Sequence, residues 1–370
     1  MREIDANTRA ETVGSLLRSP ELAQALVSGA LADSGYSDRA DQAVLDCIRL
    51  QEDAGLDVIT DGEVRRRSWA ETPDVLDCFE VHDTELPLEW HGADGEPVTQ
   101  SATGRVVVRR IASTPESYDR VAAYRFLADH TSKRTKFTLP APSYHRRFWS
   151  DRYSAVAYAR VEDYLNEIRD YTRGVVDRLV ALGCDYVQLD APNYGSLCDP
   201  AIRARLAEQG HDLDRELAFD AELDNSVFDG LSNVTSALHI CRGNNSGGRW
   251  HSTGGYGAIS AELFPALRFD RLLLEYDSER AGAFGPLAAI RTGTAAVLGL
   301  LTTKSGDLED SGLVEARIAE ASTVKPLEEL AISTQCGFAS TAAGNPVTPQ
   351  QQQAKLTLVA QLARKVWPAA

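Results

Sequence analysis

The sequence has few cysteines, no long apolar stretch and a shortage of positive charge. Only six of its 370 residues are cysteine, too few for a disulfide framework over this length. No apolar run reaches the length of a transmembrane helix, and the segment that follows Met1 lacks the apolar core of a secretory signal. Lys and Arg number 38 against 54 Asp and Glu, and the net charge of −16 argues against nucleic acid or an anionic membrane as a partner. We therefore expect a cytoplasmic protein whose functional cysteines are metal ligands or nucleophiles.

Short apolar runs alternate with stretches of helical period along most of the chain. Eight of these runs are predicted to be strands, and they span residues 11–15, 56–63, 136–142, 185–192, 237–243, 271–277, 295–303 and 330–338. Amphipathic stretches predict helices, the last with Thr348 as its N-cap, at residues 38–55, 161–183, 311–322 and 348–367. Strand–helix alternation repeated eight times predicts an α/β fold, a (β/α)8 TIM barrel. A doubly wound open sheet is the main alternative, but no G-x-G-x-x-G motif follows the first strand.

One polar segment, residues 81–136, breaks this alternation between the second and third predicted strands. Its turn-forming residues and short β-branched run predict a hairpin and a helix over the mouth of the barrel. The segment is either a solvated insertion or a lid over an active site. No linker or longer repeat divides the chain, so residues 1–370 are predicted to form a single catalytic barrel domain.

Four metal-binding side chains lie at the ends of predicted strands, where a barrel of this kind carries its active site. His239 and Cys241 are two residues apart at the end of one strand and therefore point to the same face. Glu275 and Cys336 lie at the ends of two later strands, so the four side chains could converge over the barrel mouth. Zinc prefers such a set of N, S and O ligands, and ligands spread over about a hundred residues favour a catalytic site over a structural one. Taken singly, each residue could also be part of a packed core.

Several sequence motifs are shared with one known family. They are TVGSLLR, GLDVITDGEVRR, TLPAPS, VQLDAP, HICRGN, LLEYD, VLGLLTTK and QCGFAST. With these motifs the chain resembles, nearly end to end, the C-terminal catalytic domain of cobalamin-independent methionine synthase in its short single-domain members. The resemblance implies a (β/α)8 barrel with a catalytic zinc held by His239, Cys241, Glu275 and Cys336. It also implies a zinc-dependent methyltransferase that transfers a methyl group to homocysteine and so makes methionine.

The resemblance further implies a binding site for the amino acid homocysteine. Its carboxylate would lie on the turn formed by Val13, Gly14 and Ser15, which offers backbone N–H groups and a hydroxyl. Its amino group would be held by Glu63 and Asp190, because an ammonium group favours acidic partners. The alternative for these two carboxylates is a salt bridge inside the barrel with a nearby arginine.

The part of the family pattern that concerns the methyl donor is not preserved. Lys304 stands where full-length enzymes have a proton-donating histidine after the seventh strand, Ala191 replaces an acidic residue, and Ser196 replaces a glutamate. The chain is also expected to lack the second, N-terminal barrel that helps full-length enzymes to bind the folate tail. The donor is therefore left open between methyltetrahydrofolate and another methylated compound.

The implied chemistry gives catalytic roles to Glu275 and Lys304. Coordination to Zn²⁺ deprotonates a substrate thiol, and Glu275 would be the ligand most readily displaced. The leaving group needs a proton from Lys304, from a histidine such as His145, or from water. Lys304 is a poor acid unless burial lowers its pKa, and its alternative is a surface lysine at a helix start.

Two other functions remain open. An enzyme of the epoxyalkane:coenzyme M transferase type would use the same zinc and thiol chemistry, but it binds a sulfonate and should not need Glu63 and Asp190. A non-catalytic zinc-binding barrel would have no open metal position. A homo-oligomer is compatible with the sequence but not indicated by it.

Overall fold

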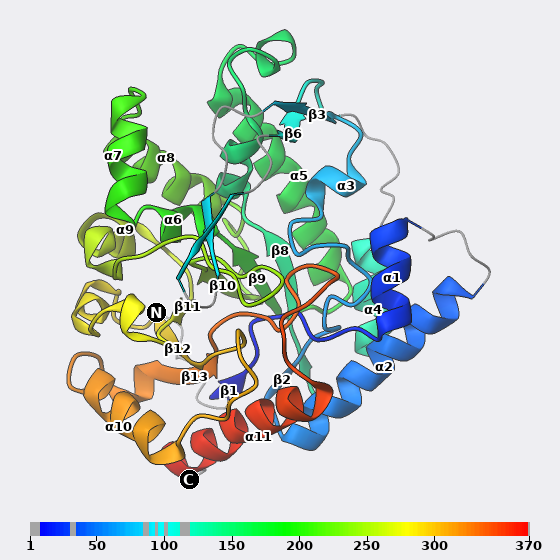
Figure 1. The fold of residues 1–370 in the computed structure, drawn as a ribbon, viewed down its shortest axis with the longest axis vertical. Helices are drawn as coiled ribbons and strands as arrows, with labels where there is room; N and C mark the ends of the chain where they lie inside the picture. The colour runs from blue at the N-terminus through cyan, green and yellow to red at the C-terminus, as the bar shows by residue number, and fades with distance from the viewer. Residues whose placement is uncertain are drawn as a thin grey trace.

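Parallel strands form one curled sheet at the centre of the molecule (Figure 1). The computed structural model describes residues 8–29, 35–83, 89–92, 95–99, 103–111 and 119–368. Within these residues the sheet has seven strands in the order β1-β13-β12-β11-β10-β9-β8. Their bounds are Ala10–Glu11 (β1), Phe137–Pro140 (β8), Tyr186–Asp190 (β9), Thr235–Ile240 (β10), Arg271–Glu275 (β11), Ala295–Leu301 (β12) and Leu330–Thr334 (β13). Strands β8 to β13 follow each other in the sheet as they do along the chain, as in a barrel of βα units.

The second predicted strand, residues 56–63, is observed as β2 (Val58–Ile59) and lies outside this ladder. It pairs in parallel with β7 (Arg134–Thr135), which a single residue, Lys136, separates from β8. A backbone hydrogen bond from Asp57 N to Ala10 O (3.0 Å) links the start of β2 to β1. Each predicted strand therefore overlaps an observed one. The predicted barrel is confirmed as a mixed α/β fold with a curled parallel sheet, while β2 joins β1 through isolated hydrogen bonds and not through a ladder.

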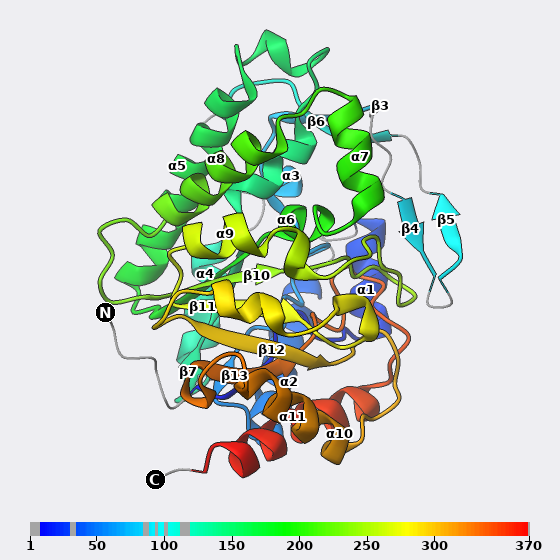
Figure 2. The ribbon, with the colours of Figure 1, turned by 90° about the vertical axis from the view of Figure 1, so that its left-hand side faces the viewer.

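Helices surround the sheet (Figures 1 and 2). The α-helices are α1 (Pro20–Ser28), α2 (Tyr36–Ala54), α3 (Thr72–Val75), α4 (Arg120–Asp129), α5 (Val161–Ala181), α6 (Pro192–Ser196), α7 (Pro200–Glu208), α8 (Leu213–Ser226), α9 (Ser260–Ala266), α10 (Ser311–Ser322) and α11 (Pro349–Val366). Short 3-10 helices are η1 (Pro142–Phe148), η2 (Ser154–Val156), η3 (Tyr256–Ala258), η4 (Glu279–Ala281), η5 (Gly285–Ala289) and η6 (Leu327–Glu329). The four predicted helices correspond to α2, α5, α10 and α11. The predicted N-cap is also observed, because the Thr348 hydroxyl accepts a hydrogen bond from Gln351 N, and Thr348 N donates one to the Gln351 side chain.

The segment predicted to leave the barrel, residues 81–136, contains hairpin strands and a helix in its described parts. The strands pair antiparallel, β3 with β6 and β4 with β5, and their bounds are Phe79–Asp83 (β3), Glu89–His91 (β4), Pro97–Thr99 (β5) and Thr103–Val107 (β6). The remainder of this prediction falls on residues outside the described ones. The helix, α4, places Tyr124 and Leu127 in the core between helices and sheet. It therefore covers the outside of the sheet and not the mouth.

The β4–β5 hairpin is attached to the loop that follows β10. His91 and Trp250 exchange backbone hydrogen bonds of 2.7 and 3.1 Å, and their rings stack with centroids 4.4 Å apart. Trp90 packs edge-on against His251 of the same loop, with ring centroids 5.2 Å apart. This loop starts at Cys241, so the hairpin lies at the edge of the sheet toward which β12 points in Figure 2. Part of the inserted segment thus reaches the carboxyl ends of the strands.

An apolar layer fills the inside of the curled sheet. It consists of one inward-facing side chain from each of seven strands or their extensions: Val13, Val58, Tyr186, Ala237, Leu273, Val297 and Ala331. Because side chains alternate between the two faces of a strand, the next inward positions after Ala237 and Leu273 hold His239 and Glu275. The apolar layer therefore forms a floor beneath polar residues at the carboxyl ends of the strands.

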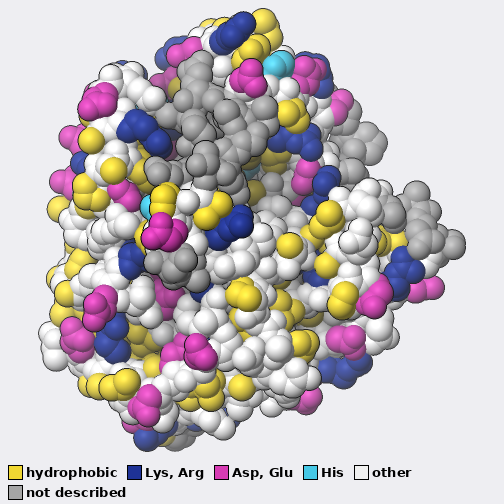
Figure 3. All heavy atoms as spheres, in the orientation of Figure 1, with side chains coloured by type: hydrophobic (Ala, Val, Ile, Leu, Met, Phe, Trp, Pro, Cys, Tyr) yellow, Lys and Arg dark blue, Asp and Glu magenta, His cyan; other side chains and the backbone are white. Residues whose placement is uncertain are grey.

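Acidic and basic side chains are interspersed over the described part of the face in Figure 3. None of the helices in the described ranges is both long enough and apolar enough to cross a lipid bilayer.

Candidate metal centre

Three strand ends bring the predicted metal ligands together. His239 lies in β10, Cys241 directly follows this strand, Glu275 ends β11, and Cys336 follows β13 by two residues. All four side chains are buried, and one ligand atom from each lies within 4.8 Å of the other three. Such a group of one imidazole, one carboxylate and two thiols can bind a metal ion.

The orientation of His239 leaves one ring nitrogen available for a metal. His239 Nδ1 lies 3.2 Å from the carbonyl oxygen of Leu273. A carbonyl only accepts, so Nδ1 carries a hydrogen, and in the neutral ring, the form that binds a metal, Nε2 has the lone pair. Nε2 is buried and has no hydrogen-bond partner among the described residues. Metal-binding histidines commonly have this arrangement, with the distal nitrogen held by a backbone carbonyl.

The two sulfur atoms have opposite tendencies to ionise. Cys241 Sγ lies 3.8 Å from Cys336 Sγ and 3.3 Å from Glu275 Oε1. The interaction with Cys241 lowers the pKa of Cys336 well below its usual value, against the effect of burial and with help from His239. The same sulfur–sulfur interaction, together with burial, raises the pKa of Cys241. Burial opposes protonation of His239, but its interaction with Cys336 raises its pKa to about 9. A thiolate is therefore already favoured within the cluster.

Cationic side chains keep Glu275 ionised. Burial alone would raise its pKa, but the charges of Lys304, Arg280 and Arg242 bring the pKa to about 2. The Lys304 Nζ atom is buried and has no hydrogen-bond partner among the described residues. The predicted proton donor thus lies within electrostatic reach of the cluster. The alternative donor, His145, is buried and hydrogen-bonded (2.9 Å) to the backbone of its own turn.

Two residues outside the predicted site hold Glu275 in place. Gln335 Oε1 accepts hydrogen bonds of 2.9 Å from the backbone N–H and the hydroxyl of Thr303. The NH₂ group of the Gln335 amide must then face Glu275, and its Nε2 lies 3.3 Å from Glu275 Oε1. The Tyr256 hydroxyl donates to Ile240 O (2.9 Å) and accepts from Glu275 N (2.8 Å), so it joins the ends of β10 and β11. The Tyr256 ring is fully buried.

Two asparagines, also without a predicted role, connect the loops around the cluster. Asn244 Nδ2 donates to Gly337 O (2.7 Å) and Ser340 Oγ (2.9 Å), which lie in the loop of Cys336. Asn345 Nδ2 donates to Asn244 Oδ1 and to the backbone after β12, both at 2.9 Å. The signal in the sequence was their place in the HICRGN motif and in a later Gly-Asn pair, which says nothing about their contacts.

The predicted amino-acid site lies beside the metal cluster. The Glu63 carboxylate accepts a hydrogen bond from Thr138 Oγ1 (2.6 Å). It lies directly over Gly14, where an added Cβ would be 2.4 Å from Glu63 Oε1. The backbone oxygen of Ser15 accepts a hydrogen bond of 2.7 Å from the loop that carries Cys336. These residues therefore meet at one edge of the sheet, although their binding roles remain predictions.

Asp190 and Val13 complete the predicted set. Asp190 is the last residue of β9 and pairs in register with His239. Its Oδ1 atom accepts a hydrogen bond of 2.7 Å from Gln188 Nε2. Burial raises the pKa of Asp190 to about 7, even though the charge of His239 lowers it. Val13 faces the apolar layer, so it can offer only its backbone to a ligand.

The backbone at Glu63 is unusual. With φ of 54°, it is the only non-glycine residue in the left-handed region among the described residues. Arg18 fixes this turn by donating to Glu63 O (2.6 Å) and Arg66 O (2.9 Å). Arg66 approaches Glu63 Oε1 only to 3.9 Å and lies closer, at 3.1 Å, to Glu71. Glu63 Oε2 is buried without a hydrogen-bond partner among the described residues, and burial raises the pKa of Glu63. A buried carboxylate in this state favours a cationic ligand.

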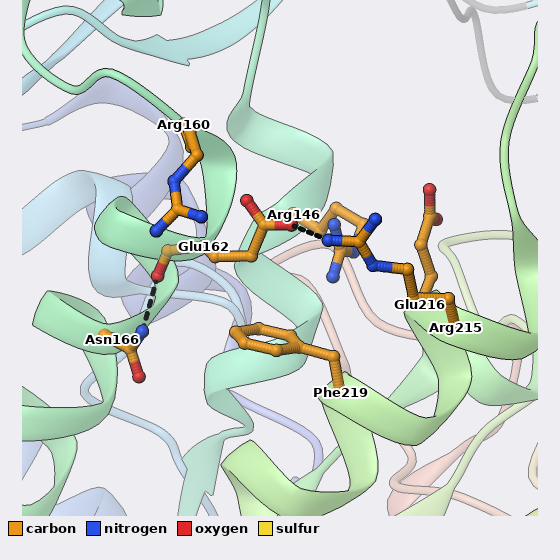
Figure 4. A pocket seen from close by; sticks show the side chains of 7 residues that line it. All are labelled: Arg146, Arg160, Glu162, Asn166, Arg215, Glu216 and Phe219. Atoms are coloured by element: carbon orange, nitrogen blue, oxygen red, sulfur yellow. Dashed lines mark hydrogen bonds and ion pairs between the residues drawn. The ribbon is translucent and has the colours of Figure 1, made fainter.

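A surface cavity lies apart from these residues (Figure 4). It lies between η1, the start of α5 and α8 and is lined by Arg146, Arg160, Glu162, Asn166, Arg215, Glu216 and Phe219. Its three arginines lie beside carboxylates of Asp220, Asp163 and Glu162. Their charges are thus already compensated, and no predicted site residue lines the cavity.

Two proteins of Bacillus subtilis are similar in sequence to nearly the whole chain. No family model matches it. It is 33% identical over 368 residues to the uncharacterized protein YxjH of Bacillus subtilis (strain 168), covering 97% of this chain and 94% of YxjH. It is 32% identical over 370 residues to the uncharacterized protein YxjG of the same organism, with the same coverage.

Solved structures with a similar fold cover nearly the whole chain. One is a Listeria monocytogenes protein provisionally named a vitamin-B12 independent methionine synthase, with a TM-score of 0.70, 23% identity and 98% coverage of both chains. Another is a B12-independent methionine synthase from Shewanella sp. W3-18-1, with a TM-score of 0.69, 18% identity and 97% coverage of both chains. A methyltransferase from Methanosarcina mazei has a TM-score of 0.55 at 12% identity. The fold thus confirms the resemblance to cobalamin-independent methionine synthases, and the chain belongs to the family of YxjH and YxjG.

Proposed function

We propose that this protein is a zinc-dependent S-methyltransferase that converts homocysteine to methionine. The observation that carries the proposal is the convergence of His239, Cys241, Glu275 and Cys336 within 4.8 Å, close to the buried carboxylate of Asp190. The scaffold we infer is a (β/α)8 barrel in which β2 is the eighth strand and the site lies at the carboxyl ends of the strands.

The four side chains suit zinc. Two sulfurs and an imidazole favour zinc over Mg²⁺ or Ca²⁺, which prefer oxygen ligands. A metal would also provide the missing partner of the buried His239 Nε2 atom. Zinc, when bound, lowers the pKa of a substrate thiol so that the reactive thiolate forms near neutral pH. Glu275 is the one oxygen ligand of the set and therefore the ligand least suited to a metal that also binds sulfur.

Residues of the protein itself would bind and orient the amino acid. Glu63 and Asp190 offer carboxylates to the α-ammonium group, and the turn of Val13, Gly14 and Ser15 offers N–H groups and a hydroxyl to the α-carboxylate. The Shewanella protein was solved in complex with selenomethionine, the selenium analogue of the proposed product. That complex supports an amino-acid site in a protein of this fold.

Lys304 is the residue we assign to the leaving group. The methyl group forms a bond to the substrate sulfur while its bond to the donor breaks, and the atom left behind takes a proton. Lys304 Nζ is buried without a hydrogen-bond partner among the described residues, and its charge acts on Glu275. It is therefore placed to give up a proton beside the cluster. The donor is methyltetrahydrofolate or another methylated compound.

The first test combines zinc content with homocysteine binding. We expect about one zinc per wild-type chain, and at least about tenfold less in Cys336→Ala, because the remaining ligands cannot complete the set. Cys78→Ala is the matched control, since Cys78 is also a buried free cysteine but belongs to another apolar cluster. Metal analysis of freshly purified protein gives the result. Equal zinc in Cys336→Ala and the wild type would contradict the four-ligand site.

Glu63→Gln tests the acceptor. Loss of a charged hydrogen-bond partner should weaken homocysteine binding about 10–100-fold in calorimetry, with zinc content unchanged. Glu208→Gln, which alters an exposed carboxylate on α7, should bind like the wild type. A zinc-loaded wild type that ignores homocysteine but binds coenzyme M would favour the epoxyalkane transferase alternative. One that binds no thiol at all would favour the non-catalytic barrel.

A further inference from the structure

A chain of polar side chains runs inside the barrel toward the proposed amino-acid site. At its base Lys136 is fully buried, between β7 and β8. Its Nζ donates to Glu11 Oε2 (2.7 Å), Thr12 O (2.7 Å) and Gln188 Oε1 (2.8 Å). An ammonium group has three hydrogens, so all of its donors are used.

This contact fixes the orientation of the Gln188 amide. Lys136 can only donate, so the oxygen of the amide must face Lys136 and the NH₂ group must face the other way. On that other side lies Asp190, whose Oδ1 is 2.7 Å from Gln188 Nε2. Gln188 and Asp190 are two residues apart in β9 and therefore share the inner face of the strand. The barrel interior thus presents a fixed donor to this carboxylate.

The hydrogen bond from Gln188 engages only one of the two carboxylate oxygens of Asp190. It occupies Oδ1, and it is the one hydrogen bond that the described residues give to this carboxylate. Oδ2 is left for a ligand at the carboxyl ends of the strands. Without the amide the carboxylate would be free to rotate about its terminal bond, because no second partner defines its plane.

We propose that Gln188, held by Lys136, is a positioning residue that aims Asp190 at the ammonium group of an amino-acid thiol. The inference rests on the proposed function and deepens it, because it names the feature by which the site distinguishes an amino acid from a plain thiol acid. The side-chain hydrogen bonds of Gln188 go to Lys136 and Asp190 and not to the metal ligands, and its full burial keeps it away from a ligand at the strand ends. Its effect should therefore appear in the selectivity for the amino group.

The test compares two thiols that differ only in the amino group. Homocysteine and 4-sulfanylbutanoate are titrated into zinc-loaded wild type, Gln188→Met and Gln188→Glu. The wild type should prefer homocysteine, and both variants should lose about 10–100-fold of that preference through weaker homocysteine binding. Gln188→Met removes the donor at similar length, and Gln188→Glu keeps the acceptor for Lys136 while it places an oxygen against Asp190. Asn225→Leu is the matched control, because Asn225 is a buried amide whose partners are backbone atoms at positions 266 and 268.

The outcomes separate the two proposals. A wild type without preference for homocysteine contradicts the amino-acid acceptor itself. If the wild type prefers homocysteine and a folded, zinc-loaded Gln188 variant keeps the same preference, that result overturns only the role of Gln188. A purely structural role would lower the melting temperature of the Gln188 variants and leave the ratio of the two affinities unchanged. Should Gln188→Met not fold, the isosteric Gln188→Glu decides by the same ratio.

Discussion

At the scale of single residues, the buried acids Glu63 and Asp190 stand out. Both are almost fully buried, and burial raises the pKa of each. Neither has the set of donors that usually stabilises an ionised carboxylate in a protein interior. The ionised form of such a carboxyl group is unfavourable without a ligand and is stabilised when a cation binds. The ionisation of these two groups should therefore respond to binding of the proposed substrate.

The pH dependence of homocysteine binding should report this ionisation. In the empty protein burial raises the pKa of Asp190 to about 7, opposed by the charge of His239. A protonated carboxyl cannot pair with an ammonium group, so affinity should fall with decreasing pH, by up to about tenfold per unit below the pKa. The measurement is the ratio of homocysteine to 4-sulfanylbutanoate affinity between about pH 8 and pH 6. A ratio independent of pH would contradict pairing with Asp190, because thiol ionisation affects both ligands alike.

The sequence predicted some site residues and missed others for a physical reason. His239 and Cys241 could be found because side chains alternate between the two faces of a strand, so residues i and i+2 share one face. In a barrel of this kind, active-site residues also lie at the carboxyl ends of the strands. Gln188 and Gln335 could not be found, because their amides are oriented by Lys136 and Thr303, which lie 52 and 32 residues away in the chain. An amide in a strand has no typical role until its partners are known.

At the scale of elements, the turns after β1 and β2 fit together through one glycine. A Cβ at position 14 would come within 2.4 Å of Glu63 Oε1 and 3.2 Å of the Thr138 methyl group. We expect Gly14→Ala to displace the Glu63 carboxylate and weaken homocysteine binding about tenfold or more, with zinc content unchanged. Calorimetry and metal analysis measure the two effects. Gly174→Ala, at a helical position with no atom near the added Cβ, is the control.

Normal homocysteine affinity in Gly14→Ala would mean that Glu63 does not hold the ligand from this position. Loss of zinc as well would mean that the two turns are needed for the metal cluster itself.

Element boundaries show where the sequence was less informative. The predicted strand 56–63 is observed only at Val58–Ile59, because the chain then turns, with Gly62 and Glu63 in the left-handed region. Apolar periodicity contains no information about backbone dihedrals. α4 was predicted as part of a covering insertion, but its apolar face contacts the core, since it is the helix that precedes β8.

At the scale of the whole molecule, a buried charge cluster spans the barrel interior. Glu11 of β1 receives hydrogen bonds from Lys136 (2.7 Å) and from Arg271 of β11 (2.8 Å), and all three side chains are buried. Burial opposes ionisation of Glu11, but the charges of Lys136 and Arg271 lower its pKa to about 2. The cluster thus connects strands from different parts of the sheet beneath the proposed site.

Glu11→Gln should lower the free energy of unfolding by about 3–5 kcal/mol, because two buried cations lose their shared anion. The sign of the pH effect follows from the lowered pKa. Glu11 contributes stability above its unfolded pKa of about 4.3, and the contribution is lost as the pH falls toward 2. Urea unfolding should therefore show the difference from wild type at neutral pH and a smaller difference in acid. Glu208→Gln should stay within about 0.5 kcal/mol of wild type, and a similarly small change in Glu11→Gln would contradict this account.

The overall architecture was the most predictable level. Repeated alternation of strands and helices leaves few topologies, and parallel strands with helical crossovers curl into a barrel or an open sheet. The buried charges inside it were not predictable, because Glu11, Lys136 and Arg271 appear in the sequence as ordinary charged residues at strand starts.

The closeness of two sulfur atoms in the proposed zinc site has a practical consequence for any zinc measurement. Cys241 and Cys336 lie 3.8 Å apart, and one of them favours the thiolate form. A thiolate beside a second thiol is readily oxidised, and the bound metal is what protects such a pair. If the proposed site lost its zinc in air, Cys241 and Cys336 would form a disulfide, and zinc could then no longer bind. A low zinc content then records how a sample was handled as much as how well it binds, so the stoichiometry has meaning only for protein kept reduced from the cell onward.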